Sequence, residues 1–295
     1  MLLKPKLSPT EHGARLFFLA CAVVALGQMF LIMLFLFKES LGLFTSGTSL
    51  KEFFFSVNWY PTYDSPEFGS LALVVGSLTV TFFSTVLAAP IGLSLAVFLA
   101  CLAGRTTREW VKPAVEMMAG IPSVVLGFVG LVVVAPLMQD ILDIPTGLNV
   151  LNASVILALM AVPSIASLGE DALSAVPGEI QDASYALGAT KWETIWRITV
   201  PAAMSGLSTA VILGLGRALG ETLVVLMVAG GAAQIPHSIF DSVRPLTATL
   251  AAEMGETAID SPHYHALFAL GTILFLLTLA FNLLAYWLGR YWRRR

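Results

Sequence analysis

The chain has 295 residues, of which 57% are hydrophobic and 12% are charged, and its mean hydropathy is +0.84. About a quarter of the residues of a soluble globular domain carry a charge, so this composition excludes a soluble protein and indicates a membrane protein. The formal net charge of −3 is uninformative as a sum, whereas the distribution of the charges along the chain is informative.

Six apolar stretches are long enough to cross a bilayer as helices, which takes roughly 20 residues each. Their polar and apolar residues do not alternate as in barrel strands, so backbone hydrogen bonding in lipid leaves only helices. We therefore predict an all-α membrane protein with six transmembrane helices. The stretches are approximately residues 16–37, 71–101, 115–138, 150–169, 202–230 and 265–289.

The first stretch is longer than the core of a signal peptide, and no small-residue cleavage site follows it, so we expect a retained helix. The predicted layout is an N-terminal segment 1–15, the first helix 16–37, an outer loop 38–70, a core 71–289 with a polar segment 171–201, and a basic tail 290–295.

The basic residues predict the orientation, because they favour the cytoplasmic side of a membrane. If the N-terminus is cytoplasmic, only Lys38, Lys51 and Arg244 lie outside, and Arg217 lies within a span. The other twelve of the sixteen basic residues then lie in cytoplasmic segments. We therefore expect both termini and the segment 171–201 on the cytoplasmic side.

Prolines interrupt the second, third and fourth stretches. Pro90 predicts a kink in the second. The segments Gly-Ile-Pro-Ser at 120–123 and Ala-Val-Pro-Ser at 161–164 each place a serine directly after a proline. One interpretation is a pair of kinks whose freed carbonyls bond the hydroxyls of Ser123 and Ser164. The other is a helix break that lines a translocation path, which makes both serines candidate pathway residues.

The fifth stretch is rich in glycine, so we expect it to be central to helix packing. It also holds Arg217 and Glu221, which are four residues apart and share one face of the predicted helix. A charge within the membrane costs on the order of 2.5–3.5 kcal/mol, so such charges pair and face the bundle interior. Either the pair only locks helix packing, or it forms a polar pathway site whose planar guanidinium suits an oxyanion. Residues 246–254, beyond this stretch, predict a short re-entrant or surface helix.

No pattern predicts catalysis, since the chain has no G-x-x-x-x-G-K-[ST] loop and no Ser/His/Asp or Cys/His arrangement of note. His263 and His265, with Glu256 and Asp260 nearby, could form a metal site, but alternate residues on an interfacial loop favour rings at the headgroup level. Cys21 and Cys101 lie in apolar runs and indicate packing side chains rather than a disulfide. We expect no enzyme activity, no metal, no cofactor in this chain and no nucleic-acid partner.

The most specific pattern is D-A-S-Y-A-L-G-A-T-K-W-E-T-I-W-R-I-T-V-P at residues 182–201. An amphipathic segment with a central glycine, kept out of an otherwise apolar chain, predicts docking of a soluble partner. The spacing resembles the EAA loop of ABC-importer permeases, E-A-A-x-x-x-G, then nine residues, then I-x-L-P. Asp for Glu, Ser for Ala and Val200 for Leu are the departures. The motif positions are Asp182, Ala183, Ser184, Gly188, Ile198 and Pro201.

Further motifs are similar to those of the phosphate-importer permeases, over roughly residues 15–289. They include Gly-Ile-Pro-Ser at 120–123, Gly-Arg-Ala-Leu-Gly-Glu-Thr at 216–222 and His-Tyr-His-Ala-Leu-Phe at 263–268. Trp-Tyr-Pro at 59–61 and the six-span layout favour the PstC-type subunit over its PstA-type partner. The resemblance implies a type I ABC importer permease with a MetI-like fold, in the cytoplasmic membrane of a bacterium.

The resemblance also implies a function and a set of partners. The segment 182–201 would be a helix–turn–helix that docks on the ATPase, and Arg217 and Glu221 would be the polar residues of a phosphate pathway. The partners would be a PstA-type permease, two PstB-type ATPase subunits that hold ATP and Mg, a PstS-type extracytoplasmic binding protein, membrane lipid and a phosphate-signalling regulator. The alternatives are an importer of another oxyanion (sulfate, molybdate or phosphonate) and a membrane scaffold for phosphate sensing.

Overall fold

The structure, a computed structural model, describes residues 9–293 and confirms the prediction of six helices of membrane length. The predicted segments 1–15 and 290–295 therefore lie partly outside the described residues. In chain order the elements are α1 (Pro9–Thr45), α2 (Leu50–Phe55), β1 (Trp59–Tyr60), β2 (Glu67–Phe68), α3 (Leu71–Val97), η1 (Phe98–Leu102), α4 (Arg105–Ala119), α5 (Ser123–Val129), η2 (Gly130–Val134), α6 (Ala135–Leu142), α7 (Val150–Ser174), α8 (Gly178–Ala186), α9 (Lys191–Thr194), η3 (Ile195–Thr199), α10 (Val200–Leu219), α11 (Leu223–Val228), α12 (Leu246–Glu253), η4 (Met254–Glu256) and α13 (Pro262–Arg293).

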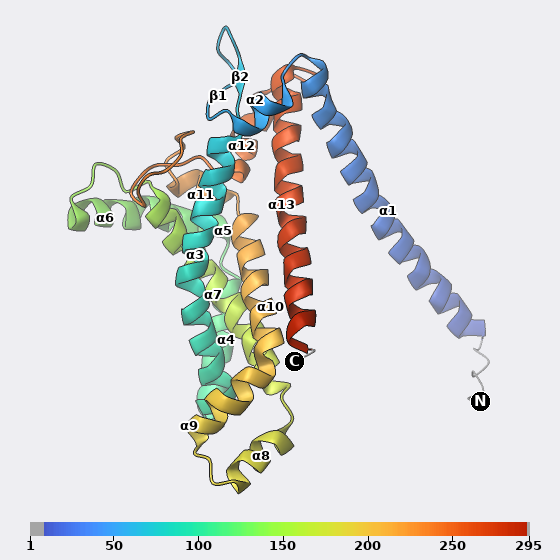
Figure 1. The fold of residues 1–295 in the computed structure, drawn as a ribbon, viewed down its shortest axis with the longest axis vertical. Helices are drawn as coiled ribbons and strands as arrows, with labels where there is room; N and C mark the ends of the chain where they lie inside the picture. Colours follow the sequence, from blue (N-terminus) through green and yellow to red (C-terminus); the bar gives the residue numbers. More distant parts are fainter. Residues whose placement is uncertain (1–8, 294–295) are drawn as a thin grey trace.

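The bundle has two distinct ends (Figure 1). The hairpin end carries β1 and β2, and the α8 end carries α8 and α9. At the hairpin end α1 continues to Thr45, past the predicted end of the first span at residue 37. The two strands pair antiparallel, with Trp59 opposite Phe68, and the Trp59 side chain is buried against the Phe68 ring.

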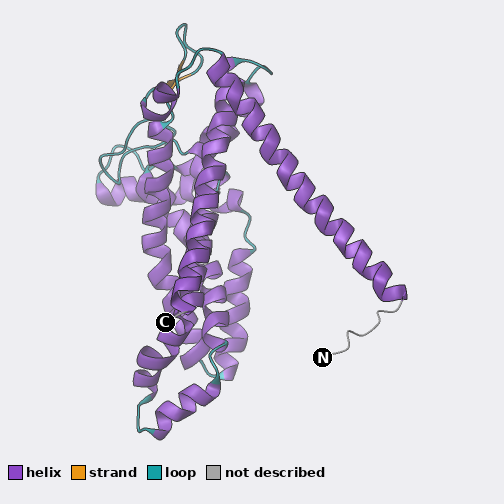
Figure 2. Ribbon diagram, turned by 45° about the vertical axis from the view of Figure 1, so that its right-hand side comes forward, coloured by secondary structure: helices purple, strands orange, loops and turns teal. Residues whose placement is uncertain are grey.

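The helix α1 leans away from the rest of the bundle (Figures 1 and 2). Close to the hairpin end, Phe35 and Phe37 pack edge-on against Phe268 and Phe275 of α13, at ring-centroid distances of 5.4 and 6.4 Å. The large apolar side chains of residues 16–32 are largely exposed. A helix that exposes apolar side chains all round needs apolar surroundings, so this surface suits lipid or another membrane helix.

The helix α7 forms the centre of the bundle, where α3 and α10 pack along it. Glycines permit these three helices to approach one another closely. A Cβ atom added at Gly92 of α3 would come within 2.8 Å of Ile165, and one at Gly214 of α10 would come within 2.6 Å of the same side chain. Gly169 of α7 is similarly close to Ala96 of α3. The glycine-rich fifth stretch is therefore central to the packing, as predicted.

The two proline–serine segments, which look alike in the sequence, fold differently. At residues 120–122 the chain leaves helical geometry between α4 and α5, so the third span is Ser123–Leu142 and begins later than the predicted residue 115. Pro163, by contrast, lies inside the continuous helix α7. The first segment is therefore a helix break, whereas the second remains helical throughout; that the break lines a translocation path stays a prediction.

Widened π-helical turns accommodate two other prolines. Pro136 follows η2 and Pro201 follows η3, and the N–H groups just before them bond five residues back, Ala135 to Gly130 and Val200 to Ile195. Proline lacks an N–H, so the preceding turn cannot keep the ordinary hydrogen bonds to the residue four positions back. It forms the wider π-helical turn instead. Helical structure consequently runs without interruption from Lys191 to Leu219.

The segment between α11 and α13 folds over the hairpin end. Gly230 and Val243 form a short parallel bridge, in which the Val243 N–H donates to the Ala229 carbonyl at 2.8 Å. The helix α12 follows, in agreement with the short helix predicted at residues 246–254. Its first residue, Leu246, is fully buried in a cluster with Leu267 and Leu270 of α13.

Replacing Gly230 by alanine is expected to destabilise the protein more than replacing Gly231. Both residues have positive φ, 93° and 74°, a region that costs an alanine about 1–2 kcal/mol. At Gly230 the new methyl would also meet the Ser242 side chain and the Leu148 carbonyl, whereas nothing lies within 4 Å at Gly231. Thermal unfolding of the two purified variants measures the difference, and equal losses would contradict the crowding argument.

Candidate functional site

The fifth predicted stretch, residues 202–230, is divided beside Arg217. The helix α10 ends at Leu219, residues 220–222 are not helical, and α11 begins at Leu223. α10 therefore ends partway along the bundle, whereas α3 and α13 run most of its length (Figure 1). The N–H groups at the break remain bonded, Gly220 to Gly216 at 3.2 Å and Glu221 to Ala218 at 3.4 Å.

Arg217 and Glu221 do not share a helical face, and this part of the sequence analysis is wrong. The prediction required a continuous helix, and the break at residues 220–222 moves Glu221 off the face that carries Arg217. The Arg217 Nη1 atom instead donates to the Ser164 hydroxyl of α7 at 2.9 Å. Among the described residues no carboxylate lies within ion-pair distance of Arg217, whose exposed side chain leaves its other N–H donors accessible.

The other candidate pathway residues are distributed around the two helix breaks. Glu221 is half-buried, and its Oε1 atom accepts a hydrogen bond from the Thr222 N–H at 3.2 Å. Ser123 begins α5 directly after the first break and is also half-buried. The structure thus brings Ser164 and Arg217 together, while in the described part of the chain no hydrogen bond joins Ser123 to either of them.

The helix α12 contacts the second break, which the sequence analysis did not anticipate. The Thr247 hydroxyl donates to the Glu221 carbonyl at 2.7 Å, and the Leu246 N–H donates to the Ser77 hydroxyl of α3 at 2.8 Å. Thr247 lies 26 residues beyond Glu221, so no local pattern in the sequence could have revealed the contact.

The segment 182–201 folds as a helix, a turn and a second helix. Gly188 has φ of +86° and ends α8, with the Ala189 N–H donating back to the Ser184 carbonyl at 3.2 Å. Thr190 and Glu193 form a reciprocal capping box that starts α9. The Ser184 and Thr194 hydroxyls, 2.9 Å apart, join the two helices, so Ser184 holds the turn together rather than facing outward.

The outer surface of this helix–turn–helix carries most of the predicted contact residues. Asp182, Ala183, Gly188 and Pro201 are exposed, and Ile198 is half-buried. Leu187, which the sequence analysis did not single out, is 90% exposed at the tip of the turn. The sequence does place an apolar residue directly before the turn glycine. At a protruding turn such a residue is exposed, and this pattern could have indicated a contact residue.

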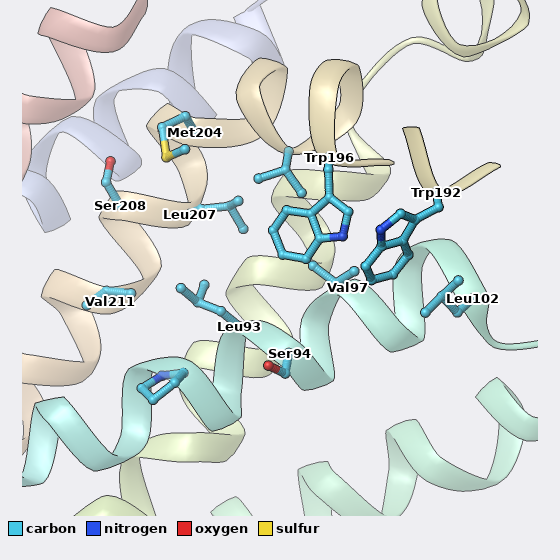
Figure 3. Close-up of a pocket in the computed structure, with 12 residues that line it drawn as sticks. Leu93, Ser94, Val97, Leu102, Trp192, Trp196, Met204, Leu207, Ser208 and Val211 are labelled. Atoms are coloured by element: carbon cyan, nitrogen blue, oxygen red, sulfur yellow. The ribbon is translucent and has the colours of Figure 1, made fainter. Parts of the chain in front are cut away.

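An apolar groove lies between α3, η3 and α10, with a cavity of about 470 Å³. Trp192 and Trp196, whose rings are 5.5 Å apart, lie over Val97 and Leu102 (Figure 3). The hydroxyls of Ser94 and Ser208 and the indole N–H groups of the two tryptophans are the polar groups of an otherwise largely apolar lining. Such a lining suits an acyl chain or an apolar helix, and it excludes the groove as a binding site for a small anion.

A buried carboxylate near the α8 end was missed by the sequence analysis. Glu170 of α7 is fully buried and accepts hydrogen bonds from both Arg108 and Lys112 of α4. The hydrogen bond to Glu170 raises the pKa of the Lys112 ammonium. Arg108 and Lys112 are one helical turn apart, and this pair of cations on one helix face could have indicated a shared anionic partner. That partner is about sixty positions away in the sequence, so only the tertiary structure identifies it.

His263 and His265 do not converge on one site. The His263 Nε2 atom lies 2.8 Å from the Glu253 carboxylate, whereas the His265 Nδ1 atom lies 2.9 Å from the Glu39 carbonyl. Glu39, Asp260 and His265 have potential ligand atoms within 4.8 Å of one another, and this group does not include His263. The two histidines belong to separate clusters, which argues against a shared metal site.

Comparisons with known proteins agree with one another. Residues 88–295 match the family described as "Binding-protein-dependent transport system inner membrane component". The probable ABC transporter permease protein YqgH of Bacillus subtilis (strain 168) is 38% identical over 280 residues, which cover 95% of this chain and 91% of that protein. The phosphate transport system permease protein PstC of Pasteurella multocida (strain Pm70) is 34% identical over 256 residues, 80% of this chain and 79% of that protein.

A solved structure of the MetNI methionine ABC transporter in an inward-facing conformation superposes with a TM-score of 0.57. The alignment covers 74% of this chain and 93% of that chain at 24% identity, which shows a shared fold. The structure and this likeness together confirm the predicted all-α fold of the type I importer permeases.

Replacing Glu170 by glutamine is expected to destabilise the contact between α4 and α7. Glutamine keeps the size of the side chain but removes the charge that balances Arg108 and Lys112. Those two cations are partly exposed, so we expect a loss of about 1–3 kcal/mol, less than for a fully buried pair.

Thermal unfolding of the purified protein measures this loss, with Asp171→Asn as the matched control. Asp171 is exposed and lies 3.8 Å from Lys112, so its neutralisation is expected to cost less than about 0.5 kcal/mol. An unfolding temperature equally lowered in both variants would contradict a special role for the buried carboxylate.

Proposed function

Because the chain belongs to the family of binding-protein-dependent transport inner membrane components, and to its PstC-type ABC permeases, we propose that it carries inorganic phosphate. The protein is a multi-pass inner membrane subunit of an ABC importer and is not itself an enzyme. The finer proposal concerns the cargo, the pathway through the membrane and the coupling to ATP hydrolysis.

The observation that carries the phosphate proposal is the hydrogen-bond partner of Arg217. Its guanidinium has a neutral hydroxyl as its hydrogen-bond partner, whereas Arg108 and Arg244 each contact a carboxylate. An unpaired charge in a membrane span is costly, so it is retained where it meets a charged ligand. The planar donor fork of arginine matches the oxygens of phosphate and binds them with two parallel hydrogen bonds.

The helix breaks support a pathway at the same place. Non-helical backbone at membrane depth is tolerated where it is buried in protein or lines a polar cavity. Ser123 directly follows the break at residues 120–122, Glu221 lies in the break at residues 220–222, and Ser164 bonds the Arg217 side chain beside the second break, which supports a pathway there. We assign Glu221 the role of limiting how tightly the passing anion is held, because its charge repels phosphate.

The coupling proposal rests on the continuity between the helix–turn–helix and Arg217. Helical structure from Lys191 to Leu219 joins the exposed turn to the break, a distance of about 40 Å along the helix axis. A displacement at the turn therefore moves the pathway arginine without an intervening flexible hinge. In this proposal the α8 end is cytoplasmic, as the basic residues predict, and an ATPase subunit that holds ATP and Mg receives the turn.

The transport cycle then follows from rigid helices that alternate between two arrangements. Docking of a loaded binding protein at the hairpin end and ATP binding on the opposite side favour the outward-open arrangement, and hydrolysis restores the inward-open one. The partners in this proposal are a PstA-type second permease, two PstB-type ATPase subunits, a PstS-type binding protein, surrounding lipid and a phosphate-signalling regulator.

Replacing Arg217 by alanine is expected to lower phosphate uptake by about tenfold to a hundredfold, which corresponds to the loss of one charge-assisted hydrogen bond to the anion. Arg217→Lys keeps the charge but not the fork, so we expect an intermediate loss. Radiolabelled phosphate uptake into proteoliposomes that contain the complete importer provides the measurement.

Arg105→Ala is the matched control, because Arg105 is exposed at the α8 end and, within residues 9–293, its ion-pair partner is Glu109 on the same helix. Wild-type uptake by an assembled Arg217→Ala variant would show that the arginine is not part of the phosphate pathway. Competition by sulfate, molybdate and a phosphonate in the wild-type assay tests the cargo, and preferential uptake of one of these anions would overturn the phosphate proposal.

Replacing Leu187 by serine is expected to weaken the docking of the ATPase subunit. The exposed leucine at the tip of the turn is the side chain best placed to enter a groove on a partner, and burying it is worth about 1.5–3 kcal/mol. We therefore expect at least a tenfold loss of affinity for the ATPase, measured by co-purification and by ATPase titration into permease-containing nanodiscs. Leu50→Ser, at the opposite end and 60% exposed, is the control and should bind normally.

A further inference from the structure

The Glu253 carboxylate gathers donors from three separate segments at the hairpin end. The Trp59 indole N–H donates to it at 3.0 Å, Arg244 Nη1 at 2.7 Å, and His263 Nε2 lies at 2.8 Å. The carboxylate is 15% exposed and the Trp59 side chain is buried, so these bonds are only partly screened by solvent. We refer to Glu253, Trp59, Arg244 and His263 together as the outer clamp.

The outer clamp lies at one end of α12, and the second helix break lies at the other. Glu253 is the last residue of α12, while Leu246 and Thr247 in its first turn bond Ser77 and the Glu221 carbonyl. α12 has eight residues, so it is about 12 Å long. A short helix held at both ends by side-chain hydrogen bonds moves as one rigid piece, and its two attachments therefore shift together.

The clamp also borders a cavity that opens at the hairpin end. The cavity has a volume of about 400 Å³, and the stacked rings of Tyr60 and Tyr63 form part of its wall beside Trp59. Both tyrosine side chains are exposed, so a protein that approaches this end reaches the hairpin strand whose tryptophan donates to Glu253. A contact on the hairpin therefore acts on the clamp directly.

We propose that Glu253 is a positioning residue through which the extracytoplasmic binding protein, by contacting the hairpin, sets the position of α12 and hence of the Glu221 carbonyl at the pathway break. This inference rests on the proposed function in that it needs an importer stimulated by its binding protein, but it does not depend on phosphate being the cargo. Glu253 itself touches neither the cargo nor the nucleotide.

The charges around the clamp explain why a carboxylate is required. Arg244 supplies one positive charge, and His263 supplies a hydrogen-bond donor from α13. Glu256 lines the same cavity and carries a second negative charge. Glutamine at position 253 would keep one acceptor oxygen but would lose the attraction to Arg244 and offer an N–H to groups that are themselves donors. The three segments would then separate, and α12 would lose its outer attachment while its inner one stays.

The test uses the complete importer in nanodiscs and measures ATPase activity with and without the ligand-loaded binding protein. Glu253→Gln is expected to reduce the stimulated-to-basal ratio at least about fivefold, as expected for the loss of a charge-assisted hydrogen bond. Trp59→Phe, which keeps the ring packing but removes the donor, should reduce the same ratio. Co-purification with the partner subunits verifies that the variants assemble.

Controls on the same helix separate positioning from general damage. Thr247→Val removes the inner hydroxyl and should reproduce the loss, whereas Thr247→Ser keeps it and should restore stimulation. Thr249→Val removes a hydroxyl that donates to the carbonyl of Pro245, the residue before α12, and Glu256→Gln neutralises the other acid of the cavity, so both should behave as wild type. Combining Glu253→Gln with Thr247→Val should give no further loss, because both act on one connection.

Unchanged stimulation in both Glu253→Gln and Thr247→Val would overturn the proposal, as would an equal loss in Glu256→Gln or Thr249→Val. Failure of the phosphate assignment gives a different result, because the wild-type importer would then show no stimulation by a phosphate-loaded binding protein. In that case the ratio is measured with the binding protein and ligand that do stimulate the wild type, and the comparison between variants keeps the same meaning.

Discussion

The structure depends on the requirement that every backbone polar group within the membrane finds a hydrogen-bond partner inside the protein. Long helices meet it over most of the chain, and at two departures from regular helical geometry a side chain from another helix supplies a partner. The Asn152 side chain donates to the Gly130 carbonyl in the π-helical turn η2, and Thr247 donates to the Glu221 carbonyl at the second break. Irregular backbone is thus confined to places where other elements can satisfy it, and these are the places where polar side chains gather.

The same requirement keeps the connections between distant parts of the molecule helical and therefore stiff. Because η3 widens to accommodate Pro201 and does not end the helix, helical structure continues from Lys191, just after the exposed turn at Gly188, to Leu219, two residues beyond Arg217. At the hairpin end, α12 is held at both ends by side-chain hydrogen bonds and approaches the same break from the other side. The break beside Arg217 is therefore connected to both ends of the bundle, through α10 on one side and α12 on the other.

Much of the fold followed from the amino-acid sequence, since the six spans, the short helix near residue 246 and the helix–turn–helix around Gly188 depend on local composition and turn chemistry. The errors share one cause. The i, i+4 prediction for Arg217 and Glu221 treated residues 202–230 as one helix, although Gly220 and the neighbouring Thr247 permit a break. The similar segments at Pro122 and Pro163 likewise differ because of what surrounds them, and their own residues do not distinguish a break from a continuous helix.

The sequence alone determined that this chain spans a membrane, which apolar segments form the spans and which polar segment folds as a helix–turn–helix, because hydropathy and turn residues act locally. Only the tertiary structure decided that Arg217 meets Ser164 instead of Glu221, that Glu170 neutralises Arg108 and Lys112, and that Glu253 joins three distant segments. These contacts link residues up to 194 positions apart, so they depend on how the helices pack and not on any pattern within one of them.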